Sequence, residues 1–170
     1  GMCELTLNEE IPENVRENNE NIHQASKNLM SIINDLLDFS KIESGNMELS
    51  CSQYRLSEVL NDVLYMTSAR KGGKKIEYLV DCDPDIPDVL YGDELRIKQI
   101  MINLITNAIK YTEEGGFLLS VSHRREKHGI NLIISVKDSG IGIQKSQLGK
   151  IFNAYGRIES EKVHAIEGTG

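Results

Sequence analysis

The sequence predicts an α+β domain preceded by an antiparallel helical hairpin, and three observations lead to this fold class. An uninterrupted apolar repeat with alternating spacings of three and four covers residues 22–39, which is typical of a helix packed against other helices. From about residue 46 onwards, short strand-like runs are mixed with longer helical patterns. Turn signals rich in glycine and proline separate these runs, as in a mixed domain.

The composition is that of an ordinary globular chain. Its 170 residues suffice for one compact domain with a helical appendage, and 39% of them are apolar. The formal charge of −7 argues against an electrostatic nucleic-acid surface, so we expect no nucleic-acid partner. The basic pairs Lys74-Lys75 and Arg124-Arg125 stand beside predicted turns and are interpreted as solvated loop charges.

The cysteines and the hydropathy bear on location. Cys3, Cys51 and Cys82 fit neither a metal-ligand spacing nor a disulfide framework, so a reduced, cytoplasmic setting is expected. No signal peptide opens the chain, and no apolar run approaches the length of a membrane span. We therefore expect no membrane contact by this segment, and any membrane anchor of a parent protein would lie outside it.

Residues 1–45 are predicted to form the helical hairpin. Residues 2–7 are interpreted as the tail of one helix, and Pro12 suits the first turn of the next. Gly45 is the expected stop. The apolar seam consists of Ile22, Ala25, Leu29, Ile32, Leu36 and Phe39. A buried helix of a monomer can show the same stripe, but the unbroken repeat favours a helical bundle.

Residues 46–170 are predicted to form the mixed domain. We expect strands over residues 47–55, 76–80, 117–123 and 130–136, and helices over residues 56–70, 93–114 and 148–155. Ser57 and Asp93 are candidate N-caps, and Gly115-Gly116 is the expected end of the long helix. Its apolar face is predicted to use Leu95, Ile97, Ile100, Met101, Leu104, Ile105 and Ile109. The segment 83–91 contains two prolines and is expected to be irregular.

Two asparagines mark the long helix. The stretch NLITNAIKYT occupies residues 103–112, and Asn103 and Asn107 lie on one helix face because they are four residues apart. Lys110 can join them. An amide oxygen can ligate Mg²⁺, and a nearby ammonium can offset phosphate charge. Taken alone, polar residues on an exposed helix face are the commoner explanation.

A carboxylate and two glycines follow the last predicted strand. The stretch DSGIGI occupies residues 138–143, where Asp138 leads into Gly140 and Gly142. Glycines let the backbone approach a flat ligand closely, and an aspartate can accept a hydrogen bond from an exocyclic amine such as that of adenine. The same pattern occurs in ordinary turns, so both interpretations stay open at this point.

The last residues form a third element. The stretch EGTG at residues 167–170 follows a polar run too long for a tight turn. Such a run suits a mobile flap whose backbone N–H groups meet phosphates. A frayed terminus is the alternative explanation.

Taken in order, these stretches resemble the asparagine, first glycine and second glycine boxes of sensor histidine kinases. IFNAY at residues 151–155 is similar to the family's phenylalanine box, and LLDFSKIESG at residues 36–45 looks like the end of its dimerisation hairpin. The resemblance covers essentially the whole chain. It implies a two-layer α/β sandwich of the gyrase and histidine-kinase type, which binds Mg²⁺ and ATP between the long helix and the flap.

The resemblance also implies roles for individual residues. Asn107 would ligate Mg²⁺, with Asn103 and Lys110 near the phosphates and Tyr111 beside the nucleotide. Asp138 would hold the adenine amine. The remaining ATP-binding positions are Gly140, Ile141, Gly142 and Ile143 at the base pocket, and Gly168, Thr169 and Gly170 over the phosphates. Phe152 and Tyr155 would anchor the flap, although a core role explains both nearly as well.

By this resemblance, the expected activity is transfer of the ATP γ-phosphate to a histidine in two-component signalling. Hydrolytic relatives similar to gyrase carry a glutamate one turn before the metal-binding asparagine, where it acts as a general base. Asn103 stands at that position and cannot accept a proton at neutral pH. Glu94, further up the helix, is interpreted as a residue of the capping turn. Phosphoryl transfer to a protein side chain is therefore favoured over hydrolysis.

No histidine of the chain fits the family's phospho-acceptor, which is normally followed by an acidic residue. His23 precedes Gln24 and is interpreted as a surface histidine of the hairpin. His123 and His128 flank a predicted turn, and His164 lies in the predicted flap, where it could reach a phosphate. We therefore assign no catalytic residue within this chain and expect the acceptor upstream of it.

The chain also ends inside the second glycine box, so we expect uncovered apolar surface. The fragment is predicted to bind nucleotide weakly and not to phosphorylate itself. The partners implied by the resemblance are a second copy, bound through the hairpin, and the receiver domain of a response regulator. Two other functions stay open: a degenerate interaction module that does not use ATP, and an ATP-hydrolysing relative. The intact Asn107 and Asp138 count against the first, and Asn103 against the second.

Overall fold

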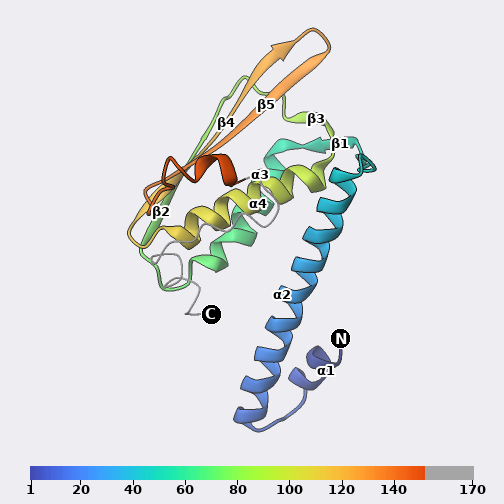
Figure 1. The fold of residues 1–170 in the computed structure, drawn as a ribbon, viewed down its shortest axis with the longest axis vertical. Coiled ribbons are helices and arrows are strands. Elements are labelled where there is room, and N and C mark those ends of the chain that lie inside the picture. The colour runs from blue at the N-terminus through green and yellow to red at the C-terminus, as the bar shows by residue number, and fades with distance from the viewer. Residues whose placement is uncertain (152–170) are drawn as a thin grey trace. The chain divides into compact units, whose positions relative to one another are not determined.

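The computed structural model describes residues 1–151, and the chain divides into two compact units, residues 1–49 and 50–170. The sequence predicts this boundary at residues 45–46. In chain order the elements are α1 (Met2–Leu7), α2 (Glu13–Glu43), β1 (Ser52–Arg55), α3 (Leu56–Ser68), η1 (Ala69–Lys71), β2 (Ile76–Cys82), β3 (Val89–Gly92), α4 (Glu94–Tyr111), β4 (Gly115–Glu126), β5 (Gly129–Asp138) and η2 (Leu148–Lys150) (Figure 1). The predicted α+β class with an N-terminal helical hairpin is confirmed.

The first unit is a short helix folded back on a long one. The side-chain amide of Asn19 donates to the carbonyl oxygen of Cys3 over 2.9 Å, and the Arg16 guanidinium donates to that of Leu7 over 3.1 Å, so α2 holds α1 by polar contacts. Gly45 adopts a positive φ of 68° just after the end of α2, as predicted for the stop. The large apolar side chains of the predicted α2 seam are exposed; they are Ile22, Leu29, Ile32, Leu36 and Phe39.

The second unit contains two sheets. β4 is the central strand of the larger one: it pairs in parallel with β2 and antiparallel with β5. The β4–β5 pair is the hairpin expected from the sequence, extended at both ends. β1 and β3 form a separate antiparallel pair.

One face of the three-stranded sheet is covered by α3 and α4 (Figure 1), which makes a layer of helices on a layer of strands. Alternate residues of β4 point into the core because successive side chains of a strand face opposite ways. The fully or almost fully buried apolar side chains are Tyr54, Leu56, Val59, Val63, Ile76, Met101, Ile105, Ala108, Ile109, Phe117, Leu119 and Val121.

The predicted elements differ from the structure around β1 and β3. The first strand is shorter than expected, and β3 lies in the segment that its prolines had marked as irregular. Both differences have one cause, because these two short strands are stabilised by pairing with each other across the chain. Ser57 is also not the N-cap of α3. The Asp88 side chain accepts from the Ser57 N–H over 3.0 Å, so the cap comes from a distant residue.

The long helix differs from the expectation in two respects. It ends at Tyr111, with Thr112 in an extended conformation, before the glycines that open β4. Of its predicted apolar face, Met101, Ile105 and Ile109 are buried. By contrast, Leu95, Ile100 and Leu104 are exposed in the described part of the chain. The helix therefore carries two apolar stripes, of which only one contacts the sheet.

Candidate nucleotide site

The start of α4 is fixed by hydrogen bonds to one carboxylate. Asp93 accepts from the backbone N–H of Arg96 over 3.1 Å, as predicted for an N-cap, and from that of Ser50 over 2.9 Å. The hydrogen bond from Arg96 has the largest effect, and together with that from Ser50 it holds the pKa of Asp93 below its usual range. The helix that carries the predicted site therefore has a defined beginning.

A lysine joins α4 to α3 near this end. The Lys98 ammonium lies 2.6 Å from the Asp62 carboxylate of α3 and 2.7 Å from the Glu94 carboxylate one turn away. The hydrogen bond to Asp62, followed by that to Glu94, raises the pKa of Lys98. This lysine thus stays charged and links the two helices.

The two asparagines lie on the exposed side of α4. Asn103 and Asn107 are both exposed, whereas Ile105 and Ala108 between and beyond them are buried against the sheet. The face that the sequence assigned to both amides is therefore open to a ligand. One turn further on, the Lys110 ammonium lies 5.2 Å from the centre of the Tyr111 ring, so these two half-buried side chains lie together.

The loop after β5 rests on the last turn of α4. The N–H of Ile141 donates to the carbonyl oxygen of Tyr111 over 3.1 Å. A Cβ added at Gly140 would lie 2.3 Å from that same oxygen, so only glycine allows this approach. Asp138 is exposed, and its Oδ1 accepts from the Gly140 N–H over 2.9 Å. The carboxylate thus stands beside the helix end that carries Lys110.

A serine attaches the other side of this loop to β4. The Ser139 hydroxyl oxygen accepts from the Gly116 N–H over 3.0 Å, and the Ser139 N–H donates to the Gly116 carbonyl over 3.0 Å. Gly142 has a positive φ of 68°, a conformation that other residues seldom adopt. Ser139 belongs to the DSGIGI stretch, but its hydrogen bonds to Gly116 did not follow from the sequence.

The structure thus brings the asparagine helix and the aspartate loop together at one end of the second unit. Ile141 and Ile143 of the same loop have exposed side chains. The predicted flap residues Gly168, Thr169 and Gly170, together with Phe152, Tyr155 and His164, lie outside the described residues. The sequence alone did not indicate a role for Lys74, whose ammonium binds carbonyl oxygens at the end of α4. Its only signal was a basic pair before a predicted strand.

The residues at this site are chemically suited to a nucleotide with a divalent cation. Among residues 1–151 there is no group of three or more histidine, cysteine or acidic side chains able to hold a metal ion. The exposed Asn107 amide oxygen is of a type that can ligate Mg²⁺. The same part of the chain has no helix long and apolar enough to cross a bilayer.

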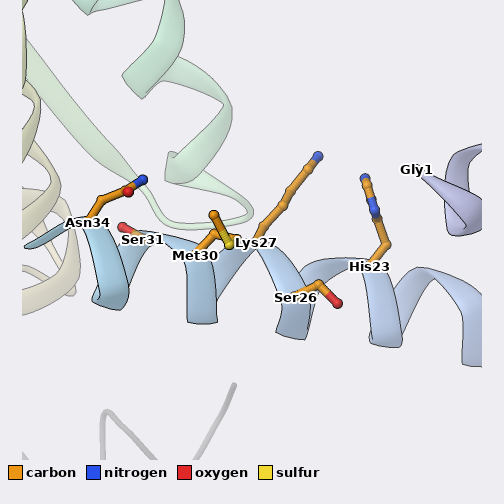
Figure 2. A pocket seen from close by; sticks show the side chains of 7 residues that line it. All are labelled: Gly1, His23, Ser26, Lys27, Met30, Ser31 and Asn34. Carbon is orange, nitrogen blue, oxygen red and sulfur yellow. The ribbon is translucent and has the colours of Figure 1, made fainter.

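Two histidines of the described residues have defined surroundings. The His123 ring, on β4, is almost buried, and its Nδ1 lies 2.9 Å from the carboxylate of Asp83. Asp83 directly follows β2, so this contact joins β4 to the end of β2. His23 lines a shallow, open groove of about 490 Å³ along α2, together with Lys27, Met30 and Asn34 (Figure 2). Its Nε2 is 3.9 Å from the Glu4 carboxylate.

Two family models match the chain. Residues 1–45 match the His Kinase A (phospho-acceptor) domain, and residues 92–170 match the histidine kinase-, DNA gyrase B-, and HSP90-like ATPase family. The first match covers the helical hairpin, and the second begins at Gly92, one residue before the N-cap of α4.

Curated relatives match over the whole chain. It is 35% identical to the hybrid signal transduction protein dokA of Dictyostelium discoideum and 33% identical to the signal transduction histidine-protein kinase BarA of Escherichia coli K12. Each alignment covers 100% of this chain, which spans 10% of dokA and 19% of BarA. The crystal structure of full-length ShkA in complex with AMPPNP is similar, with a TM-score of 0.74 and 28% identity, over 98% of this chain and 35% of ShkA.

Proposed function

We propose, from the premise that this chain belongs to the sensor histidine kinases, that it binds ATP at the end of α4 and delivers the γ-phosphate to a histidine of its parent protein. The parent would act in two-component signalling. Because the chain spans only a small part of its relatives, the activity is assigned to the parent protein and its binding step to these residues.

One observation carries the proposal. The Asp138–Ile143 loop is hydrogen-bonded to the last turn of α4 through Ile141 and Tyr111, so an adenine-binding carboxylate and a phosphate-binding helix face adjoin each other. Asp138 has four lone-pair positions and gives one of them to Gly140, which leaves acceptor capacity for an exocyclic amine. The glycine at position 140 is required for the close packing of loop on helix.

The remaining residues have complementary tasks. The Asn107 amide oxygen would hold Mg²⁺, with Asn103 and the Lys110 ammonium near the phosphates. Mg²⁺ bound with the nucleotide would neutralise charge on the phosphate oxygens. Asn103 has no basic group with which to activate water, which favours transfer to a protein side chain over hydrolysis.

The acceptor histidine and the partners belong to the parent protein. We propose that the exposed apolar seam of α2 packs against a second copy and that a response-regulator receiver domain takes the phosphate. We propose that the segment lies in the cytoplasm, whether or not the parent protein is anchored in a membrane. The chain by itself is predicted not to phosphorylate itself, since none of its histidines is followed by an acidic residue.

The decisive experiment measures the affinity of the full-length protein for Mg·ADP by calorimetry. Asp138→Ala should raise Kd by at least about tenfold, because the adenine amine loses its acceptor. Asp81→Ala removes another exposed aspartate, from β2, and should leave Kd unchanged. The unsubstituted protein with labelled ATP should yield acid-labile phosphoprotein.

Two results would count against the proposal. If the unsubstituted protein binds no Mg·ADP, the nucleotide site is wrong. If it binds the nucleotide but releases free phosphate without ever carrying label, the hydrolytic alternative replaces the kinase.

A further inference from the structure

We infer that Lys74 is a positioning residue of the nucleotide site, which acts by holding the last turn of α4; this inference rests on the proposed function. The Lys74 ammonium lies 3.2 Å from the carbonyl oxygen of Ile109, 3.1 Å from that of Lys110 and 3.2 Å from that of Thr112. It also lies 2.9 Å from the Glu113 carboxylate. The three N–H donors of the ammonium are thus shared among four acceptors, three of which are carbonyl oxygens at the end of α4.

The end of α4 needs such a partner. The last carbonyl groups of any α-helix lack partners within the helix, and in many helices the N–H groups at a left-handed residue, commonly glycine, satisfy them. Thr112 is extended instead, with φ −109° and ψ 123°, so the chain leaves α4 without that motif. A cation at the negative end of the helix dipole replaces it. Lys74 comes from the loop before β2, far away in the sequence.

The same turn carries the predicted nucleotide contacts. Lys74 binds the carbonyls of Ile109 and Lys110, and the next carbonyl, that of Tyr111, receives the Ile141 N–H of the aspartate loop. The side chains of Lys110 and Tyr111 project from this turn. Lys74 therefore fixes the row of carbonyls against which the Asp138 loop is aligned, without itself belonging to the pocket.

Glu113 completes the arrangement. Its carboxylate accepts from the half-buried Lys74 ammonium just before β4 begins, and Gly116 of that strand binds Ser139. The connection from α4 to β4 is thereby held at both ends. Without Lys74, the last turn of α4 would lose its cap and the loop would lose a defined neighbour.

The test compares two lysines of the same domain in the full-length protein. Lys74→Met should weaken Mg·ADP binding by roughly tenfold, the usual scale for a residue that supports a binding group. Lys74→Arg, which can still donate to the carbonyls, should restore Kd to within about threefold. Lys98→Met removes a less exposed lysine that bridges Asp62 and Glu94 near the start of α4. It should lower the melting temperature but leave Kd within about twofold.

Each outcome decides the matter. An unchanged Kd in Lys74→Met would overturn the inference while leaving the proposed function intact. An equal loss of Mg·ADP affinity in Lys98→Met would also overturn it, since reduced stability alone would then explain the effect. If Lys74→Met does not fold, Glu113→Gln replaces it: a rise in Kd of about threefold supports the inference, and no rise overturns it. Absence of binding in the unsubstituted protein would overturn the proposed function and the inference with it.

Discussion

Gly140 lies so close to Tyr111 that a Cβ added to it would be 2.3 Å from the Tyr111 carbonyl oxygen. This contact allows the loop after β5 to reach the last turn of α4, where the Ile141 N–H completes the junction. The relationship links a strand end and a helix end that are distant in sequence. It also makes the candidate site sensitive to a single methyl group.

Gly140→Ala should therefore separate the loop from the helix. We expect a loss of stability of about 1–3 kcal/mol from the clash and a rise in the Kd for Mg·ADP of at least about tenfold. Gly149→Ala is the matched control, because open space surrounds that glycine. Urea denaturation and calorimetry measure the two effects, and normal affinity in Gly140→Ala would show that the junction is dispensable.

The N-cap of α4 should contribute to acid sensitivity. The pKa of Asp93 is lowered in the folded chain by the N–H groups of Arg96 and Ser50, so the folded state favours the ionised carboxylate. Its contribution is complete above the ordinary aspartate pKa of about 3.9 and is lost as the pH falls through the lower folded value. Asp93→Asn should therefore reduce the fall in melting temperature between about pH 5 and pH 3. A pH dependence identical to that of the unsubstituted chain would contradict this assignment.

Replacing two buried threonines by valine, one at a time, should change the stability of the chain in opposite directions. The Thr112 side chain is buried, and its hydroxyl has no partner within the described residues, whereas the Thr67 hydroxyl donates to the Val63 carbonyl over 2.7 Å. Thr112→Val should be neutral or stabilising by up to about 1 kcal/mol, and Thr67→Val destabilising by a similar amount. Urea denaturation of both variants compares them. Equal destabilisation by both would mean that the Thr112 hydroxyl is bonded in solution.

The exposed seam of α2 should govern self-association. Leu36→Lys introduces a charge into the seam and should weaken the proposed dimer of the full-length protein by at least about tenfold. Leu79→Lys, at an exposed apolar position of β2, is the control and should leave the dimer intact. Sedimentation at a series of concentrations distinguishes them. A dimer unaffected by Leu36→Lys would remove the seam from the interface.

Local signals account for the elements that the sequence predicted well. The apolar repeat of residues 22–39 specifies a long helix, and Asp93 caps α4 as expected, because both depend on neighbours a few residues away. The β4–β5 pair also followed from its own alternating pattern. For the site, the sequence placed Asn103 and Asn107 on one face by helix geometry alone, and that face is exposed.

Tertiary structure decided what depends on distant partners. α4 ends at Tyr111, before the glycines, and the Lys74 ammonium binds the carbonyl groups at this end. In the sequence, Lys74 is only one of two adjacent loop charges. The cap of α3 comes from Asp88, and β3 exists because β1 pairs with it. Which apolar stripe of α4 is buried was settled by the position of the sheet. The sequence by itself determined periodicities and caps, since these are local; hydrogen bonds and contacts between remote segments arise only when the chain has folded.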